Sequence, residues 1–168
     1  MNNALLNNIA RFILLLAAQI LVFNKVNLFE FINPYPYILF LILYPVNSNK
    51  NTFLLASFAL GITMDLFCNS GGVHAAACVV LAFLRPQIFK FAFGLSYEYQ
   101  TVKLNDVLTP ERFSFIIAAV FIHHLVLFIL ELFSFELFFE VLFRTVLCGI
   151  FTIILSISII YLIKPKKR

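Results

Sequence analysis

An acid, a tight turn and an imidazole lie close together in the stretch GITMDLFCNSGGVHAA, residues 61–76. Asp65 stands inside an apolar run, the turn-forming sequence Asn69-Ser70-Gly71-Gly72 follows, and His74 comes two residues later. These residues could form a Ser70–His74 dyad for hydrolysis, a binding site, or a hydrogen-bonded joint between two helices. Ser70 has no nucleophile-elbow context and shares one helix start with His74, so the spacing disfavours a hydrolase and favours a tight hairpin.

Asp65 lies near the end of its apolar segment, and Gly61 lies one turn earlier on the same helix face. Glycine lets a second helix approach closely, which predicts a helix–helix contact here. An acid at membrane depth costs about 2.5–3.5 kcal/mol and faces protein or water. Asp65 could be a protonated acid, a cap on the next helix, or a contact to a partner or ligand. Asn69 or Ser70 can also cap that helix, and a hydrogen bond between the side chains of Asp65 and His74 is within reach.

The adjacent pair His123-His124 is a second group with chemical potential, and it lies midway along another apolar segment. Adjacent helical residues point about 100° apart, so the two imidazoles cannot form one i, i+4 metal-binding face. We expect buried hydrogen bonds that fix this helix. One histidine would reach Asp65 or a backbone carbonyl, and the other would lie at a helix interface.

Other metal or disulfide chemistry has little support in the sequence. The three cysteines fall in apolar runs, with no CxxC spacing and no matching histidine spacing. The carboxylates at the depth of the histidine pair are Asp65 and Glu131, which is too few for a metal site. Glu131 instead belongs to a cluster at the outer helix ends with Glu136, Glu140 and Arg144. We expect this cluster to be an ordinary solvated edge, and it could also be an outer docking surface. We expect neither a metal nor a cofactor.

The composition shows what kind of chain must position these residues. Of its 168 residues, 62% are hydrophobic and 12% are charged, and the mean hydropathy is +1.00. Soluble domains carry about 25% charged residues, and a soluble core of this size could not hide so much apolar surface. The chain is therefore expected to be an integral membrane protein. Its net charge of +4 lies beside apolar segments, so membrane topology explains it and no nucleic-acid partner is expected.

Six apolar segments predict an all-α fold of six transmembrane helices in a single domain over residues 1–168. The segments run over residues 9–27, 29–47, 52–68, 72–92, 111–133 and 138–163, and a cytoplasmic loop is expected at 93–110. The second and third segments are near or below the usual spanning length. Arg85-Pro86 is expected to end the fourth helix, with the Arg85 side chain reaching the lipid headgroups.

The basic residues predict the orientation of these helices. Placing both termini in the cytoplasm puts most of the lysines and arginines on the cytoplasmic side, as the positive-inside rule requires. That side receives Arg11, Lys50, Arg85, Lys90, Lys103, Arg112, Lys164, Lys166, Lys167 and Arg168. The outer side receives Lys25 and Arg144. Removing any one helix would scramble this split, so it supports six spans.

The same residues carry a family resemblance. The stretch GITMDLFCNSGGVHAAACVVLAFLRP resembles the central signature of the bacterial rod shape-determining MreD family. That signature is a Gly-x-x-x-Asp-Leu helix end, a small polar turn, Gly-x-His-Ala, and an apolar helix that ends in a basic residue. The stretch FIHHLVLFILELFSF, residues 121–135, resembles the version of the family found in Bacteroidota-type bacteria. Asp65, Gly72 and His74 carry most of the likeness.

The resemblance implies a non-enzymatic, multi-pass subunit of the cell-elongation machinery in the bacterial inner membrane. Such a scaffold would regulate cell shape and lateral peptidoglycan synthesis. It would dock the bitopic protein MreC and help to link MreB filaments to a SEDS-type glycosyltransferase and its transpeptidase. The family also resembles in fold the substrate-binding subunits of energy-coupling-factor vitamin transporters. The basic loop and tail offer a further contact to anionic membrane lipid.

Two readings of the polar residues therefore stay open. In the first, they are structural or partner-contact positions of a scaffold. In the second, the chain is a vitamin-type substrate-binding subunit of a transporter, with an outward cavity lined by Asp65, Asn69, His74 and the His123-His124 region. The candidate residues are Gly61, Asp65, Asn69, Gly71, Gly72, His74, Arg85, His123, His124 and Glu131.

Overall fold

The computed structural model describes residues 3–26, 32–94 and 108–163, and the regular elements in these ranges are helices. Five helices are long and apolar enough to cross a membrane, as the composition predicts. They are α1 (Asn3–Leu21), α3 (Lys50–Cys68), α4 (Val73–Phe93), α5 (Pro110–Leu132) and α6 (Phe138–Ile163). The shorter elements are α2 (Leu39–Leu43) and the 3₁₀ turns η1 (Phe23–Lys25), η2 (Pro36–Ile38) and η4 (Phe135–Leu137).

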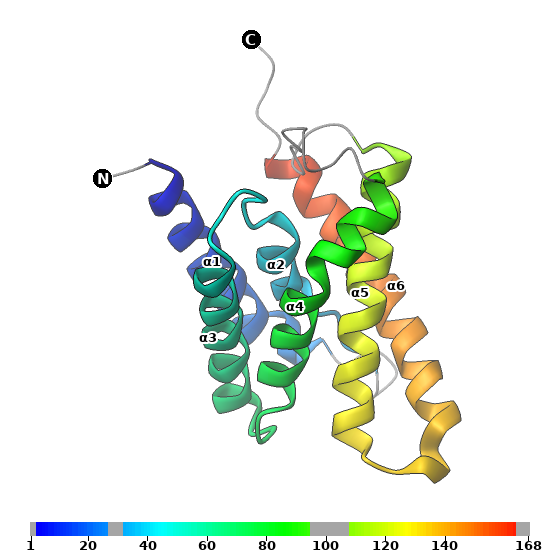
Figure 1. The fold of residues 1–168 in the computed structure, drawn as a ribbon. Helices are drawn as coiled ribbons and strands as arrows, with labels where there is room; N and C mark the ends of the chain where they lie inside the picture. Colours follow the sequence, from blue (N-terminus) through cyan, green and yellow to red (C-terminus); the bar gives the residue numbers. More distant parts are fainter. Residues whose placement is uncertain (1–2, 27–31, 95–107, 164–168) are drawn as a thin grey trace.

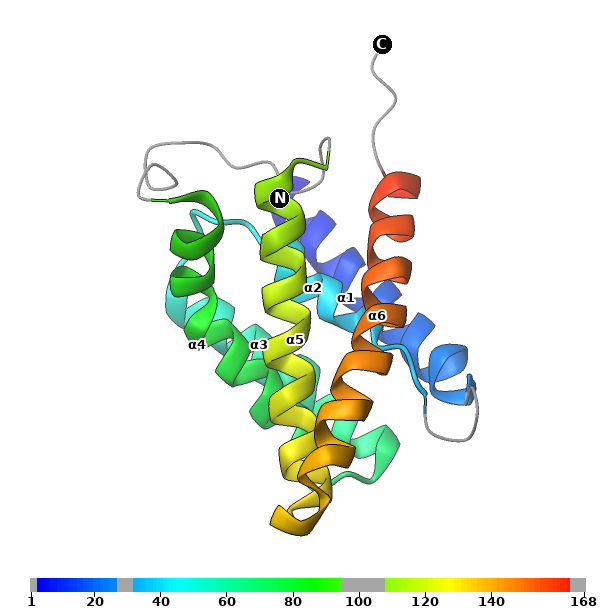
Figure 2. The same ribbon diagram turned by 90° about the vertical axis from the view of Figure 1, so that its right-hand side faces the viewer.

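The long helices pack mostly in chain order (Figures 1 and 2). α4 packs against both α3 and α5, α6 packs against α5, and α1 contacts α3 and the short α2 segment. The α3–α4 and α5–α6 turns lie at one end of the bundle, which we call the hairpin end. The start of α1 and the end of α6 lie at the opposite end, which we call the termini end.

The predicted helix over residues 29–47 is wrong. Residues 32–35 are not helical, η2 is a single 3₁₀ turn, and α2 has five residues; residues 27–31 lie outside the described ranges. The cause is the sequence Asn33-Pro34-Tyr35-Pro36. Each proline removes a backbone donor and disfavours helical geometry at the residue before it. The described chain therefore holds five long helices and a sixth, broken segment.

This broken segment is enclosed by the bundle rather than exposed to lipid. Residues 36–43 are all buried, and Tyr37, Ile38 and Leu39 have no exposed surface. Non-helical backbone is tolerated at membrane depth only where protein surrounds it and satisfies its polar groups. Gln19 of α1 supplies one such partner, because its Nε2 donates to the Pro34 carbonyl at 3.2 Å. Burial and side-chain hydrogen bonds thus replace the missing helical ladder.

Two arginines hold the C-terminal end of α2, where carbonyl groups lack helical partners. Arg11 Nη1 donates to the Leu43 carbonyl at 2.9 Å. Arg85 Nη2 donates to the Ile42 carbonyl at 3.1 Å and to the Tyr44 carbonyl. The expectation that Arg85 reaches the headgroups is therefore wrong, because its side chain is buried and caps α2. α4 also continues past Pro86 to Phe93 instead of ending there.

The remaining helix boundaries lie close to the predictions. α3, α4 and α5 differ from the expected ranges by one or two residues, and α6 begins and ends at the expected residues. The first helix lies earlier than expected, since α1 ends at Leu21 and η1 follows. Most of the expected cytoplasmic loop, residues 95–107, and the basic tail, residues 164–168, lie outside the described residues.

Candidate functional site

Asp65, near the end of α3, caps the N-terminus of α4. Its Oδ1 accepts the His74 backbone N–H at 2.9 Å, and its Oδ2 accepts the Ala75 backbone N–H at 2.9 Å. Ser70 Oγ also donates to Oδ1, at 2.5 Å. Of the three roles left open by the sequence, the structure shows the helix cap, in which the carboxyl oxygens accept backbone N–H groups from the first turn of α4.

The other expected caps of α4 are wrong. The N-cap residue is Gly72, which has no capping side chain, so neither Asn69 nor Ser70 takes that position. Asp65 meets His74 through the backbone N–H of His74 and not through the imidazole ring. Asn69 instead ends α3 in the left-handed region at φ 53°, and the backbone N–H of Ser70 donates to the Asp65 carbonyl at 3.2 Å.

Glycines let this hairpin close. Gly71 and Gly72 have φ values of 67° and 101°, which residues with a Cβ rarely adopt. Gly61 is needed for a different reason: a Cβ there would lie 2.4 Å from Ala75 Cα and 2.6 Å from the His74 carbonyl oxygen. The close helix approach predicted at Gly61 is confirmed, and it brings the backbone of α4 within reach of the Asp65 carboxylate.

A chain of hydrogen bonds runs from His74 into the centre of the bundle. The Tyr37 hydroxyl lies 2.8 Å from His74 Nδ1 and 2.9 Å from His123 Nε2. All three side chains are buried, and they come from α4, η2 and α5. A hydroxyl has one proton, so Tyr37 donates to one imidazole and accepts from the other. This single phenol therefore joins three elements of the fold.

His124 belongs to a separate chain of hydrogen bonds. Its Nδ1 lies 2.9 Å from the Val120 carbonyl oxygen, which only accepts, so Nδ1 carries the proton. In the neutral ring Nε2 is then an acceptor, and the Thr152 hydroxyl donates to it at 3.0 Å. Thr152 Oγ1 in turn accepts the Tyr35 backbone N–H at 3.0 Å. The predicted carbonyl contact is confirmed for His124, whereas the contact to Asp65 is not made by either histidine.

The sequence reasoning missed Tyr37, Gln19 and Thr152. Their partners lie far away in the chain: Tyr37 is 86 residues from His123, and Thr152 is 117 residues from Tyr35. The available signal was the pair of prolines around Tyr35, which indicates irregular backbone that polar side chains must satisfy at membrane depth. That signal points to the segment, but it does not identify the side chains that serve it.

A pocket of about 340 Å³ lies at the hairpin end, beside this network. Two of the candidate residues, His74 and Glu131, line it, and Ser70 adds a further polar side chain. Asp65, Asn69, His123 and His124 do not line it, so the cavity expected for a carrier is only partly assembled. The other lining residues are Asn24, Asn33, Tyr35, Phe67, Cys68 and Val73.

The arrangement does not assemble a hydrolytic dyad. Ser70 Oγ donates to Asp65, while His74 Nδ1 lies against Tyr37, so the hydroxyl and the imidazole have different partners. Within the described ranges, no three His, Cys, Asp or Glu side chains are grouped so that they could hold a metal ion. The hydrogen bonds of Asp65, His74, His123 and His124 instead connect α3, α4, α5, α6 and the broken segment.

When it is compared with protein-family models, with curated proteins and with solved structures, the chain has no match. The function is therefore argued from the residues of the chain itself and from the family resemblance of its signature stretch.

Proposed function

We propose that the chain is a non-enzymatic scaffold subunit of the bacterial cell-elongation complex, and that it docks a bitopic MreC-like protein in the inner membrane. One observation carries the proposal. The residues with the strongest resemblance to the MreD family, Asp65, Gly72 and His74, form the joint between α3 and α4. In this proposal the signature stretch maintains a rigid bundle, and it does not perform chemistry.

Docking would use the lateral helix faces. The turns at the hairpin end are short, and α1 and α6 carry large apolar side chains on their outer faces, such as Leu14 at 68% and Phe139 at 83% exposed. These faces suit lipid and a partner's transmembrane helix alike, because packing between membrane helices depends on shape. MreB-like filaments and the wall synthases would be reached through the bitopic partner or through the cytoplasmic edges.

The proposal is tested by affinity purification of the tagged chain from gently solubilised membranes. We expect a single-span protein with a large extracytoplasmic domain to copurify, and we expect depletion of the chain to turn rods into spheres. The matched control is an unrelated tagged six-span protein at the same expression level. If no bitopic morphogenesis protein is recovered and rod shape persists after depletion, the scaffold proposal is wrong.

A second candidate function is a vitamin-type substrate-binding subunit of a transporter. The observation that favours it is the pocket at the hairpin end, lined by His74, Ser70, Asn24 and Glu131, beside a proline-broken segment. Broken helices at membrane depth often form substrate sites in transporters. This candidate predicts a small molecule bound to the purified protein and loss of vitamin uptake, with unchanged cell shape, on depletion.

A further inference from the structure

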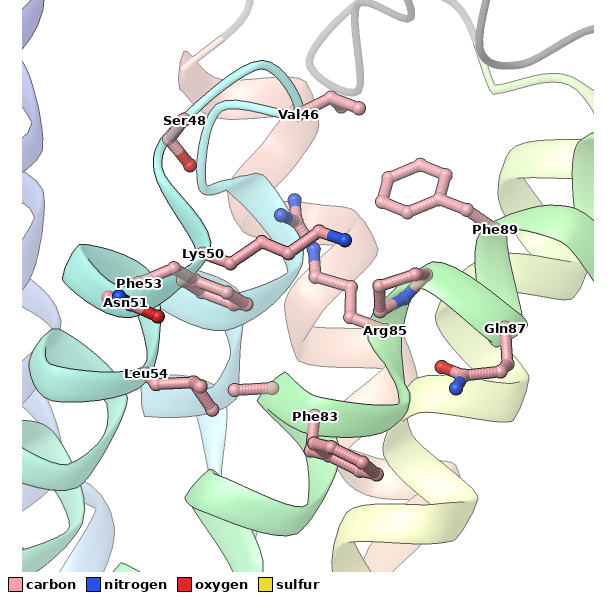
Figure 3. Close-up of a pocket in the computed structure, with 12 residues that line it drawn as sticks. Val46, Ser48, Lys50, Asn51, Phe53, Leu54, Phe83, Arg85, Gln87 and Phe89 are labelled. Atoms are coloured by element: carbon pink, nitrogen blue, oxygen red, sulfur yellow. The ribbon is translucent and has the colours of Figure 1, made fainter.

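A second pocket, of about 420 Å³, lies near the termini end of the bundle (Figure 3). It is formed by the α2–α3 loop, the first turns of α3 and the second half of α4. Two of its lining side chains are cations, Lys50 and Arg85, and none of the described residues that line it is a carboxylate. The pocket lies apart from the signature hairpin, and it has no role in the function proposed above.

Arg85 has donors left over after it caps α2. The side chain is 5% exposed, and its Nη2 serves the carbonyls of Ile42 and Tyr44. Nε is buried without a hydrogen-bond partner in the described structure. The guanidinium carbon lies 4.8 Å from the Phe53 ring centroid and 4.9 Å from that of Phe89, so aromatic rings lie against the guanidinium. Because the guanidinium N–H groups point outward in its plane, a further acceptor must approach Arg85 along the edge of the guanidinium.

Lys50 adds a second positive charge from the opposite wall. Figure 3 shows Lys50, at the start of α3, and Arg85, on α4, as two side chains that line the same pocket. Among the residues that the structure describes, the recorded ion pair is Arg144–Glu140, which lies on another helix, so neither pocket cation is neutralised by a carboxylate. Arg85 is buried, so its charge is costly to desolvate, and a bound anion would offset this cost. The positive end of the α3 dipole acts in the same direction.

The chemistry of the pocket selects a phosphate group. Arginine presents a planar edge of N–H donors that matches phosphate oxygens, and lysine binds the same oxygens as a point charge. The wall also carries apolar side chains, including Leu54 and the 65% exposed Phe83, which suit a ligand with a hydrocarbon portion. We propose that this pocket binds a phosphate group, carried by an anionic phospholipid headgroup or by a soluble phosphate ester.

Native mass spectrometry of the full chain, purified in detergent and titrated with phosphatidylglycerol, tests the proposal. Lys50→Gln is the informative variant, because Lys50 is exposed and caps no carbonyl, whereas substituting Arg85 would also disturb α2. We expect this variant to bind the lipid about tenfold more weakly, the loss that follows from one charge-assisted contact. Lys90→Gln is the control: it removes the same charge from an exposed position on α4 outside the pocket. The control should bind within about twofold of the natural chain.

A second arm of the experiment identifies the source of the phosphate. Glycerol 3-phosphate in excess will displace the lipid if the pocket serves soluble esters, and it will leave the lipid bound if the pocket serves headgroups. Either result supports a phosphate site, provided that Lys50→Gln weakens binding and Lys90→Gln does not. Unchanged binding in Lys50→Gln, or equal losses in both variants, overturns the proposal.

Discussion

At the scale of single residues, Asp65 shows how an acid can be accommodated at membrane depth. Both carboxylate oxygens accept backbone N–H groups from the first turn of α4, and Ser70 Oγ adds a third donor. These N–H groups have no partner within their own helix, so acid and helix end satisfy each other. The polar residue that looks catalytic in the sequence is thus a helix cap in the structure.

Substitution of Asp65 by asparagine should destabilise the protein by about 2 kcal/mol. The amide retains one acceptor, but its NH₂ group would face a backbone N–H that has lost its partner. The measurement is the thermal unfolding midpoint in detergent. Glu136→Gln is the control, since Glu136 is an exposed carboxylate and the same change there should leave the midpoint unaltered. Equal midpoints for the two variants would contradict the capping role.

Tyr37→Phe should cost about 1–3 kcal/mol, because it removes the hydroxyl that serves two buried imidazoles. His74 Nδ1 and His123 Nε2 would then lack this partner in a buried site. Tyr35→Phe is a matched control, since the Tyr35 ring packs beside Tyr37 and its hydroxyl makes no recorded hydrogen bond in the described chain. Unfolding midpoints of the two variants compare them directly, and a larger loss for Tyr35→Phe would rule out the Tyr37 bridge.

At the scale of elements, the contact between α3 and α4 depends on one missing methyl group. Gly61→Ala would place a Cβ 2.4 Å from the backbone of Ala75, which cannot yield without moving a helix. We expect a loss of about 1–3 kcal/mol. Gly149→Ala is the matched control in α6, because its nearest neighbour, Val120 Cγ1, would lie at an ordinary 3.8 Å. Helix propensity predicts that the control is neutral or stabilised by up to about 1 kcal/mol.

The unfolding midpoints of the two alanine variants decide this prediction. If Gly61→Ala and Gly149→Ala behave alike, α3 and α4 do not approach as closely as the structure shows. If only Gly61→Ala accumulates poorly or unfolds early, steric conflict between the helices is the cause. A double variant with Asp65→Asn should then be less destabilised than the sum, because separated helices already lose the cap.

The long helices could be predicted from sequence, whereas the broken segment could not. Runs of about 20 apolar residues have few alternatives in a membrane, so the boundaries of α3 to α6 follow from length and composition. The segment around Tyr35 and Tyr37 is apolar too, but its prolines prevent a continuous helix. Its path depends on Gln19, Arg11, Arg85 and Thr152, which come from three other helices. No local pattern reveals such distant partners.

The same distinction applies to the candidate site. The close approach at Gly61 and the cap by Asp65 connect residues at most 14 positions apart. Local spacing was therefore enough to predict the close approach and to suggest the cap. Arg85 illustrates the limit of local sequence patterns, because a basic residue before a proline at a helix end predicts an anchor at the membrane interface. The carbonyls that accept hydrogen bonds from it belong to Ile42 of α2 and to Tyr44, the residue after α2, which are 43 and 41 residues away.

At the scale of the whole molecule, the described residues form five long helices and one broken segment. α1 starts and α6 ends at the termini end (Figures 1 and 2). Lys50, at the start of α3, and Lys90, near the end of α4, are two of the basic residues predicted for the cytoplasmic side, and both lie toward that end. Positive charge favours the cytoplasmic side, so the hairpin end should face outward.

Cysteine labelling can test this orientation with residues at the two ends of one helix. Cys68 is the last residue of α3 and is exposed, whereas Cys78 and Cys148 are buried. A membrane-impermeant maleimide should therefore label spheroplasts at Cys68, and Cys68→Ser should abolish the signal. Lys50→Cys in the Cys68→Ser background places a thiol at the first residue of α3, about 27 Å away along a 19-residue helix. That distance matches the hydrocarbon thickness, so this thiol should be labelled only in inverted vesicles. Labelling of Cys68 from the cytoplasmic side alone would show that the bundle is inserted the other way round.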